Sequence, residues 1–155
     1  MKIGQNTLLF FDATCLIAAA GSPTGGSGFL LSLCARHLVK GAVSQPVLLE
    51  AERNIRSKLG IDALNRFYRF LIVIPFVLAP LPPTDELADM EKLVNEKDVH
   101  VVGAASAINA TFLLTLDRGL AKEVQHANFK FQALSPGEFI KTVLPKHEAF
   151  PGMRN

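Results

Sequence analysis

Two short runs of the chain are almost wholly apolar, and each ends at an aspartate. Residues 8–12 read LLFFD, and residues 112–117 read FLLTLD. A continuous apolar run indicates a strand that is buried on both faces, and such strands are typical of parallel sheets covered by helices. A carboxylate at the end of a buried strand is costly unless a positive group or a cation binds it. The two aspartates therefore constrain the fold and point to a site at once.

Between these runs the sequence alternates strand-like and helix-like segments. The patterns predict strands at residues 7–12, 42–44, 76–83, 112–117 and 129–134. They predict helices at residues 13–21, 28–41, 45–59, 61–71, 85–97 (capped by Thr84), 98–109, 118–125 and 135–145. Strands that alternate with helices predict a parallel sheet with helices on both sides. No internal repeat or linker divides the chain, so we expect one domain over residues 1–145 and a frayed tail over 146–155.

Composition supports a single folded domain. The chain has 155 residues, of which 49% are hydrophobic and 19% charged, which excludes a disordered protein. Cys15 and Cys34 lie in apolar runs without a CxxC spacing, so we expect reduced core thiols. The amino-terminal segment lacks the pattern of a signal peptide, and the most apolar stretch is about 11 residues long, too short for a bilayer. We expect a cytoplasmic protein with no membrane partner.

Four acidic residues are the candidate site. Asp12 and Asp117 close predicted strands, and the carboxyl ends of parallel strands meet at one edge, where ligands bind. Asp98 begins a helix of small residues, and Glu50 lies within an amphipathic helix. Carboxylates that lie close together repel unless a hard cation neutralises them, and oxygen ligands favour Mg²⁺ or Mn²⁺. Such ions activate water and stabilise phosphodiester cleavage.

Each acid also has a structural interpretation. Asp12, Asp98 and Asp117 could cap the helices that follow them. Glu50 could be a surface residue, or could pair with Arg53 three positions later. The alternatives stay open at this stage, and the joint pattern carries the metal hypothesis.

Several other polar residues accompany the acids. Thr14 and Thr115 place hydroxyls beside Asp12 and Asp117, and Arg118 is well placed to touch a phosphate. His100 is either a ligand or a structural histidine. The glycine-rich loop at residues 22–28 lacks the Lys-Ser/Thr pair of a phosphate-binding loop. Basic residues that could flank RNA, or simply be solvated, are Arg36, His37, Lys40, Arg53, Arg56, Lys58, Arg66 and Arg69.

The acidic motifs resemble those of the PIN domain family. FFDATCLIAAAGSP resembles its opening motif, SQPVLLEAERNI its glutamate helix, and KDVHVVGAASAINATFLLTLD its third and fourth motifs. The order holds over residues 7–144, and FQALSPGEFIKTVL resembles the end of the toxin nuclease branch. Thr14 stands where the family commonly has Asn or Ser, and the extra acid that some members carry after the last aspartate is absent.

The resemblance implies a Rossmann-like three-layer α/β/α sandwich with a central, mostly parallel five-stranded sheet. It implies a ribonuclease that uses Mg²⁺ or Mn²⁺, held by Asp12, Glu50, Asp98 and Asp117 with Thr115 as accessory hydroxyl. Thr14, Arg118 and Arg53 are the expected substrate contacts. Single-stranded RNA, a protein antitoxin and a second copy in a homodimer are the expected partners.

Two rival functions remain. LLFFDATCLI also resembles the nucleophile strand of haloacid-dehalogenase-like phosphatases, but those enzymes need an acid two residues after the first aspartate, where Thr14 stands. A PIN-like module that binds RNA or a protein without cleaving is the second rival. Retention of all four acids argues against it.

Overall fold

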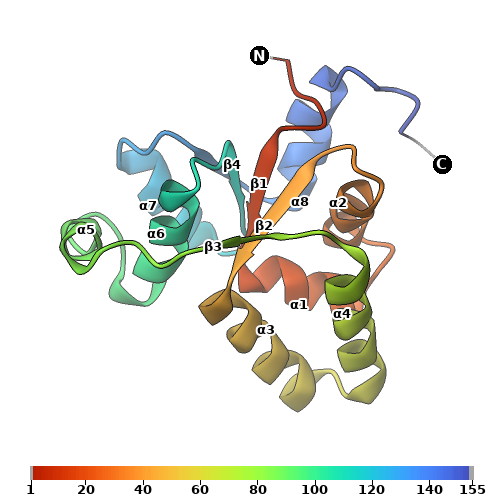
Figure 1. Cartoon of the computed structure of the whole chain (residues 1–155), viewed down its shortest axis with the longest axis horizontal. Coiled ribbons are helices and arrows are strands. Elements are labelled where there is room, and N and C mark those ends of the chain that lie inside the picture. The colour runs from red at the N-terminus through yellow and green to blue at the C-terminus, as the bar shows by residue number, and fades with distance from the viewer. Residues whose placement is uncertain (1, 154–155) are drawn as a thin grey trace.

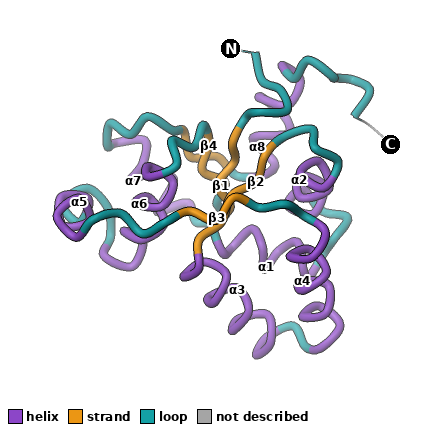
Figure 2. Tube along the Cα trace, viewed as in Figure 1, coloured by secondary structure: helices purple, strands orange, loops and turns teal. Residues whose placement is uncertain are grey.

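The computed structural model describes residues 2–153, and five strands in this range form one sheet in which every neighbouring pair is parallel. The strand order is β3-β2-β1-β4-β5. Figure 2 shows strands at the centre of the molecule with helices around them. The strands are β1 (Leu8–Phe11), β2 (Lys40–Ser44), β3 (Val77–Ala79), β4 (Phe112–Leu114) and β5 (Gln132–Leu134). The predicted five-stranded parallel sheet is confirmed.

Helices cover both faces of the sheet, as Figure 1 shows. One layer contains α1 (Ala13–Gly21), α2 (Gly26–Ala35), α3 (Gln45–Lys58), α4 (Ile61–Val73) and α8 (Pro136–Glu138). The other contains α5 (Thr84–Met90), α6 (Val99–Ala107) and α7 (Arg118–His126). Short 3-10 segments at Glu96–Asp98 and Leu144–Lys146 and a π-helical segment at Phe139–Val143 complete the chain. The predicted α/β/α sandwich is therefore confirmed.

The central strands are apolar because both of their faces are buried. Leu9, Phe10 and Phe11 of β1 have no exposed surface, and neither do the residues of β4. The rings of Phe112 and Phe139 meet edge to face with their centroids 5.2 Å apart, which ties β4 to the carboxyl-terminal helical segment. Cys15 and Cys34 are buried free thiols, as expected.

The predicted helix at residues 28–41 is too long. Helix α2 ends at Ala35, and the N–H of Leu38 donates to the carbonyl of Leu33, which closes the last turn. His37 takes a positive φ of 58°, and the chain then enters β2 at Lys40. The apolar residues 38–39 continued the helical spacing in the sequence, but the sheet uses them as the approach to a strand.

The helix predicted at residues 85–97 needs correction at both ends. Helix α5 stops at Met90 rather than residue 97, and its N-cap is Pro83, so Thr84 is the first helical residue rather than the cap. Its seven residues include no buried side chain, so tertiary packing adds little to extend it. At the last helix the predicted cap is confirmed: Ser135 and Glu138 form a reciprocal capping box.

The carboxyl-terminal tail is not frayed over residues 146–153. Ile3 pairs with His147 in a parallel bridge, and the side chains of His147 and Met153 are buried. His147 Nε2 lies 2.6 Å from the carbonyl of Leu38, while its Nδ1 accepts from the N–H of Ala149 at 2.9 Å. The sequence missed this packing because the tail has no periodic pattern. Residues 154–155 lie outside the described range.

Within residues 2–153, no single helix has the length and apolar character needed to cross a membrane. Only α1 and α2 taken together pass that test of length and composition, and they are bent by 98° at the break between them.

Candidate metal centre

The strand order reverses between β1 and β4, and three candidate aspartates lie at that switch. The chain moves from β1 outward to β2 and β3, then crosses to β4 and β5. Open α/β sheets bind ligands beyond the carboxyl ends of their strands at such a point. Asp12 follows β1, and its N–H donates to the carbonyl of Leu114 at the end of β4. The end of β1 is thereby fixed against the segment that leads to Asp117.

Asp12 is held by two threonine hydroxyls. Its Oδ2 accepts from Thr115 Oγ1 at 2.7 Å and from Thr14 Oγ1 at 2.9 Å. Its Oδ1 accepts from the N–H of Ala13 at 2.8 Å, so the carboxylate also caps α1. Only 6% of Asp12 is exposed. The structural and functional interpretations of Asp12 are therefore compatible.

The threonines also organise the loop after β4. Thr14 Oγ1 accepts from the N–H of Leu116 at 3.0 Å, and Thr115 Oγ1 accepts from the N–H of Asp117 at 3.0 Å. Thr115 thus connects the backbone of Asp117 to the carboxylate of Asp12. The sequence placed Thr115 beside Asp117, but the hydroxyl donates to Asp12.

Asp117 has one oxygen in a helix cap and one directed at a lysine. Its Oδ1 accepts from the N–H groups of Gly119 and Leu120, at 2.9 and 3.1 Å, which caps α7. Its Oδ2 accepts from Lys97 Nζ at 3.1 Å. The hydrogen bond from Leu120, followed by the Lys97 ammonium, holds the pKa of Asp117 below its usual value. Asp117 is therefore an anion at neutral pH.

Asp98 is the least satisfied of the acids. It is 8% exposed, it makes no side-chain cap to α6, and its buried Oδ2 has no hydrogen-bond partner among the described residues. Lys97 Nζ lies 3.5 Å from this oxygen. Burial raises the pKa of Asp98 despite the lysine, and the nearby carboxylates of Asp117 and Asp12 raise it further. The capping alternative for Asp98 is therefore wrong.

Lys97 is the residue that sequence reasoning missed. Its ammonium lies between Asp98 and Asp117, and its hydrogen bond to Asp117 and the charge of Asp98 raise the pKa of Lys97. The lysine side chain is 63% exposed and reaches the acids from solvent. The sequence signal was the Lys-Asp pair at residues 97–98, which the helix prediction assigned to a surface helix end.

The residues present suit a hard divalent cation in their chemistry. Asp12, Asp98 and Asp117 supply oxygen donors, and the Oδ2 of Asp98, which has no hydrogen-bond partner among the described residues, is an oxygen that a cation would bind. As the side chains stand, the described part of the chain has no group of three His, Cys, Asp or Glu residues arranged to hold an ion. Lys97 supplies the positive charge instead, so a divalent ion would have to displace its ammonium.

Glu50 is not joined to the three aspartates. It lies half-buried in the second turn of α3, and no hydrogen bond or ion pair involves its carboxylate within residues 2–153. Helix α3 begins directly after β2, so Glu50 is on the same edge of the sheet. The proposed pair with Arg53 does not form, and Arg53 is exposed. The roles of Glu50 and Arg53 remain predictions.

His100 lies near Asp98 on α6, and its Nδ1 is buried without a hydrogen-bond partner among the described residues. Nothing places the ring against the three aspartates, so the sequence alternative of a ligand stays untested.

A cavity of about 600 Å³ opens beside the aspartates. Thr115, Asp117 and Arg118 form its end nearest the acids, and α7 and the start of α8 form its walls. Arg118 therefore lies beside the candidate centre, and its contact with a phosphate stays a prediction.

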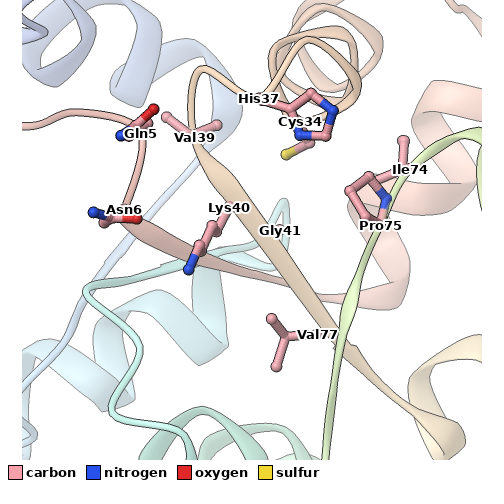
Figure 3. Close-up of a pocket in the computed structure, with 10 residues that line it drawn as sticks. All are labelled: Gln5, Asn6, Cys34, His37, Val39, Lys40, Gly41, Ile74, Pro75 and Val77. Carbon is pink, nitrogen blue, oxygen red and sulfur yellow. The ribbon is translucent and has the colours of Figure 1, made fainter.

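A second hollow of about 440 Å³ lies at the opposite edge of the sheet. Figure 3 shows Gln5, Asn6, Lys40 and Gly41 around it, near the amino ends of β1 and β2. No acidic residue lines it. This hollow therefore offers no carboxylate for a cation.

Solved structures confirm the fold that this geometry defines. VapBC2 from Rickettsia felis, bound to a DNA fragment from the promoter, aligns with a TM-score of 0.62 at 18% identity, over 83% of this chain and 98% of that chain. PAE2754 from Pyrobaculum aerophilum aligns with a TM-score of 0.61 at 19% identity, over 88% and 94%. VapBC-1 from nontypeable Haemophilus influenzae aligns with a TM-score of 0.54 at 10% identity, over 84% and 98%.

No protein-family model matches the sequence, and no curated protein matches it at a significant level. The structural similarity therefore establishes the fold. The protein has a PIN-like α/β/α fold, as the resemblance of the acidic motifs predicted.

Proposed function

We propose that this protein is a metal-dependent ribonuclease that cleaves single-stranded RNA and acts as the toxin of a toxin–antitoxin pair. The observation that carries the proposal is the buried Oδ2 of Asp98, which shares one edge with Asp12 and Asp117 and, apart from the ion pair with exposed Lys97, has no partner among the described residues. The three neighbouring carboxylates repel one another, and the largely exposed Lys97 ammonium supplies a single positive charge against them, so a divalent cation would neutralise them more fully. Mg²⁺ or Mn²⁺, when bound, would supply an activated water for phosphodiester hydrolysis.

The side chains of the protein have separable tasks in this proposal. Asp12, Asp98 and Asp117 would hold the ion, and Glu50 would complete the set from α3. Thr115 and Thr14 orient Asp12 by donating to its Oδ2, so that Oδ2 has a fixed direction before any ion binds. Arg118 lies beside Asp117 in the adjoining cavity, where its guanidinium would bind a phosphate of the RNA.

The proposed partners follow from the sequence resemblance and from the fold shared with the VapBC complexes. A protein antitoxin and a second copy of the chain are both proposed partners. We also propose that the protein acts in the cytoplasm, where RNA and the antitoxin would meet it.

The test is cleavage of single-stranded RNA with Mn²⁺ by the wild type, by Asp12→Asn and by the control Asp85→Asn. Asp85 is exposed on α5 and belongs to no described ion pair. Loss of a metal ligand removes several kcal/mol of transition-state stabilisation, so Asp12→Asn should cleave at least about 100-fold more slowly. Equal rates in all three proteins would exclude the assigned centre.

The non-catalytic PIN-like module remains the alternative. Calorimetric titration with Mn²⁺ separates the two, because a pure binding module should show no uptake that Asp12→Asn abolishes. Uptake that disappears in Asp12→Asn but persists in Asp85→Asn supports the nuclease.

A further inference from the structure

The cavity beside Asp117 has one cationic wall. Arg118, Lys122 and Gln125 stand on α7 at positions i, i+4 and i+7, so they share one face of the helix, and all three line the cavity. All three are exposed, and no side-chain hydrogen bond or ion pair involves Lys122 or Gln125 within residues 2–153. Helix α7 therefore presents the cations of Arg118 and Lys122 and the side-chain amide of Gln125 to the cavity.

The start of α8 lines the cavity with an anionic group that is fixed by hydrogen bonds. The N–H of Ser135 donates to Glu138 Oε1 at 3.0 Å, and the N–H of Glu138 donates to Ser135 Oγ at 3.1 Å. The first hydrogen bond lowers the pKa of Glu138, and the Arg118 guanidinium contributes to the same shift. A fixed carboxylate on this side repels phosphate, so a phosphate in the cavity would lie against α7.

Part of the cavity lining is apolar. Leu116 is an exposed leucine next to the acidic edge, and it lines the cavity together with Ala121. A volume of about 600 Å³ falls within the range of ligand-sized sites, which is roughly 300–1,000 Å³. The cavity thus combines cations, hydrogen-bonding groups and a small apolar surface, the combination that a nucleotide requires.

We propose that this cavity is a subsite for one unpaired nucleotide of the RNA, next to the phosphate that is cleaved. Lys122 binds the backbone phosphate of this nucleotide, Gln125 hydrogen-bonds its sugar or base, and Leu116 contacts the base face. The proposal rests on the proposed ribonuclease function, because the cavity shares Thr115 and Asp117 with the candidate centre. A base must leave its helix to reach Leu116, so the subsite selects single strands over duplexes.

The test measures RNA binding in EDTA, so that it is independent of cleavage. Fluorescence anisotropy with a labelled single-stranded RNA compares the wild type with Lys122→Ala, Gln125→Ala and the control Lys130→Ala. Lys130 is an exposed lysine that precedes β5, at the opposite edge of the sheet. All three substitutions are at exposed positions, and alanine favours the helix at residues 122 and 125, so the fold should be retained.

Lys122→Ala should weaken binding about threefold to tenfold and reduce the slope of log K against log[salt] by about 0.7, the value for one phosphate of a single strand. Gln125→Ala should weaken binding with the slope unchanged, and Lys130→Ala should change neither. Duplex RNA of the same sequence should not distinguish Lys122→Ala from Lys130→Ala.

Equal affinities and slopes for the two lysine variants on single-stranded RNA would overturn the subsite, as would a wild type that does not bind RNA in EDTA. Binding with the expected slopes but without Mn²⁺-dependent cleavage would refute the ribonuclease and support the subsite as that of a binding module. If the wild type cleaves RNA but Lys122→Ala and Lys130→Ala bind single-stranded RNA equally well, the subsite is refuted and the ribonuclease proposal stands.

Discussion

Replacing Lys97 with methionine should tighten the binding of Mn²⁺ and lower the stability of the metal-free protein. The ammonium lies 3.1 Å from Asp117 Oδ2 and 3.5 Å from Asp98 Oδ2, where it neutralises the two carboxylates. A divalent ion must displace this charge and then remain close to it. Methionine keeps most of the aliphatic stem. It removes both the ion pairs that Mn²⁺ must displace and the repulsion between the ammonium and the bound ion.

The magnitude follows from the exposure of the lysine. Because 63% of its side chain is exposed, each ion pair is screened and stabilises by roughly 0.2–1 kcal/mol. A dication and an ammonium about 6 Å apart repel by roughly 1 kcal/mol in a water-like dielectric. Together, the two ion pairs and this repulsion give about 1.5–3 kcal/mol, or a dissociation constant for Mn²⁺ that is about 10- to 150-fold lower in Lys97→Met.

Isothermal titration calorimetry measures the affinity, and thermal unfolding in EDTA measures the stability of the metal-free protein. Lys92→Met is the matched control, because Lys92 forms an exposed pair with Asp89 away from the aspartate edge. Lys97→Met should unfold at a lower temperature than the wild type in EDTA and gain more stability from Mn²⁺. Unchanged Mn²⁺ affinity in Lys97→Met, or an equal gain in Lys92→Met, would refute the argument that Lys97 occupies the position of the cation.

Two other predictions concern the network around the aspartates. Thr115→Val removes the hydroxyl that donates to buried Asp12 and should lower the free energy of unfolding by about 1–3 kcal/mol in urea titrations; a loss below the error of the titration would contradict the role of this hydrogen bond. Asp117→Ala removes a carboxylate whose pKa is lowered in the folded state, so its stabilisation is complete above the usual pKa of about 4 and is lost as the pH falls through the lower folded value. The stability difference between wild type and Asp117→Ala should therefore be constant at neutral pH and shrink below about pH 4. A difference that grows on acidification would show that the pKa of Asp117 is raised, not lowered, in the folded protein.

Local sequence signals predicted the central strands β1 and β4 because burial on both faces leaves few polar positions, whereas the strands predicted at residues 76–83 and 129–134 were too long, since β3 and β5 have three residues each. The runs at residues 8–12 and 112–117 could be recognised from composition alone, and β1 and β4 lie within them. The end of α2 could not be recognised, because the apolar residues 38–39 keep a spacing that suits either a helix or the entry to a buried strand. The tail was missed for a related reason: His147 and Met153 pack against distant parts of the chain without any local pattern.

The candidate site was also predicted only in part from local sequence. Asp12, Asp98 and Asp117 were predicted from their places in the sequence, and the fold brings all three to one edge. The capping interpretation of Asp98 could be rejected only from its hydrogen bonds. Glu50 belongs to the predicted set, but whether its side chain joins the aspartates depends on the path of α3, which local spacing does not fix.

The sequence by itself determined a parallel sheet between helices and an excess of carboxylates at its edge, because hydrophobic periodicity and strand ends are local properties. Only the tertiary structure decided which groups donate hydrogen bonds to those carboxylates and which group neutralises their charge. Asp12 receives hydroxyls from Thr14 and Thr115, a residue more than 100 positions away, and Asp98 and Asp117 share the ammonium of Lys97. Charge balance at a site depends on distances in space, and these are set by strand order at the switch between β1 and β4 rather than by neighbours in the chain.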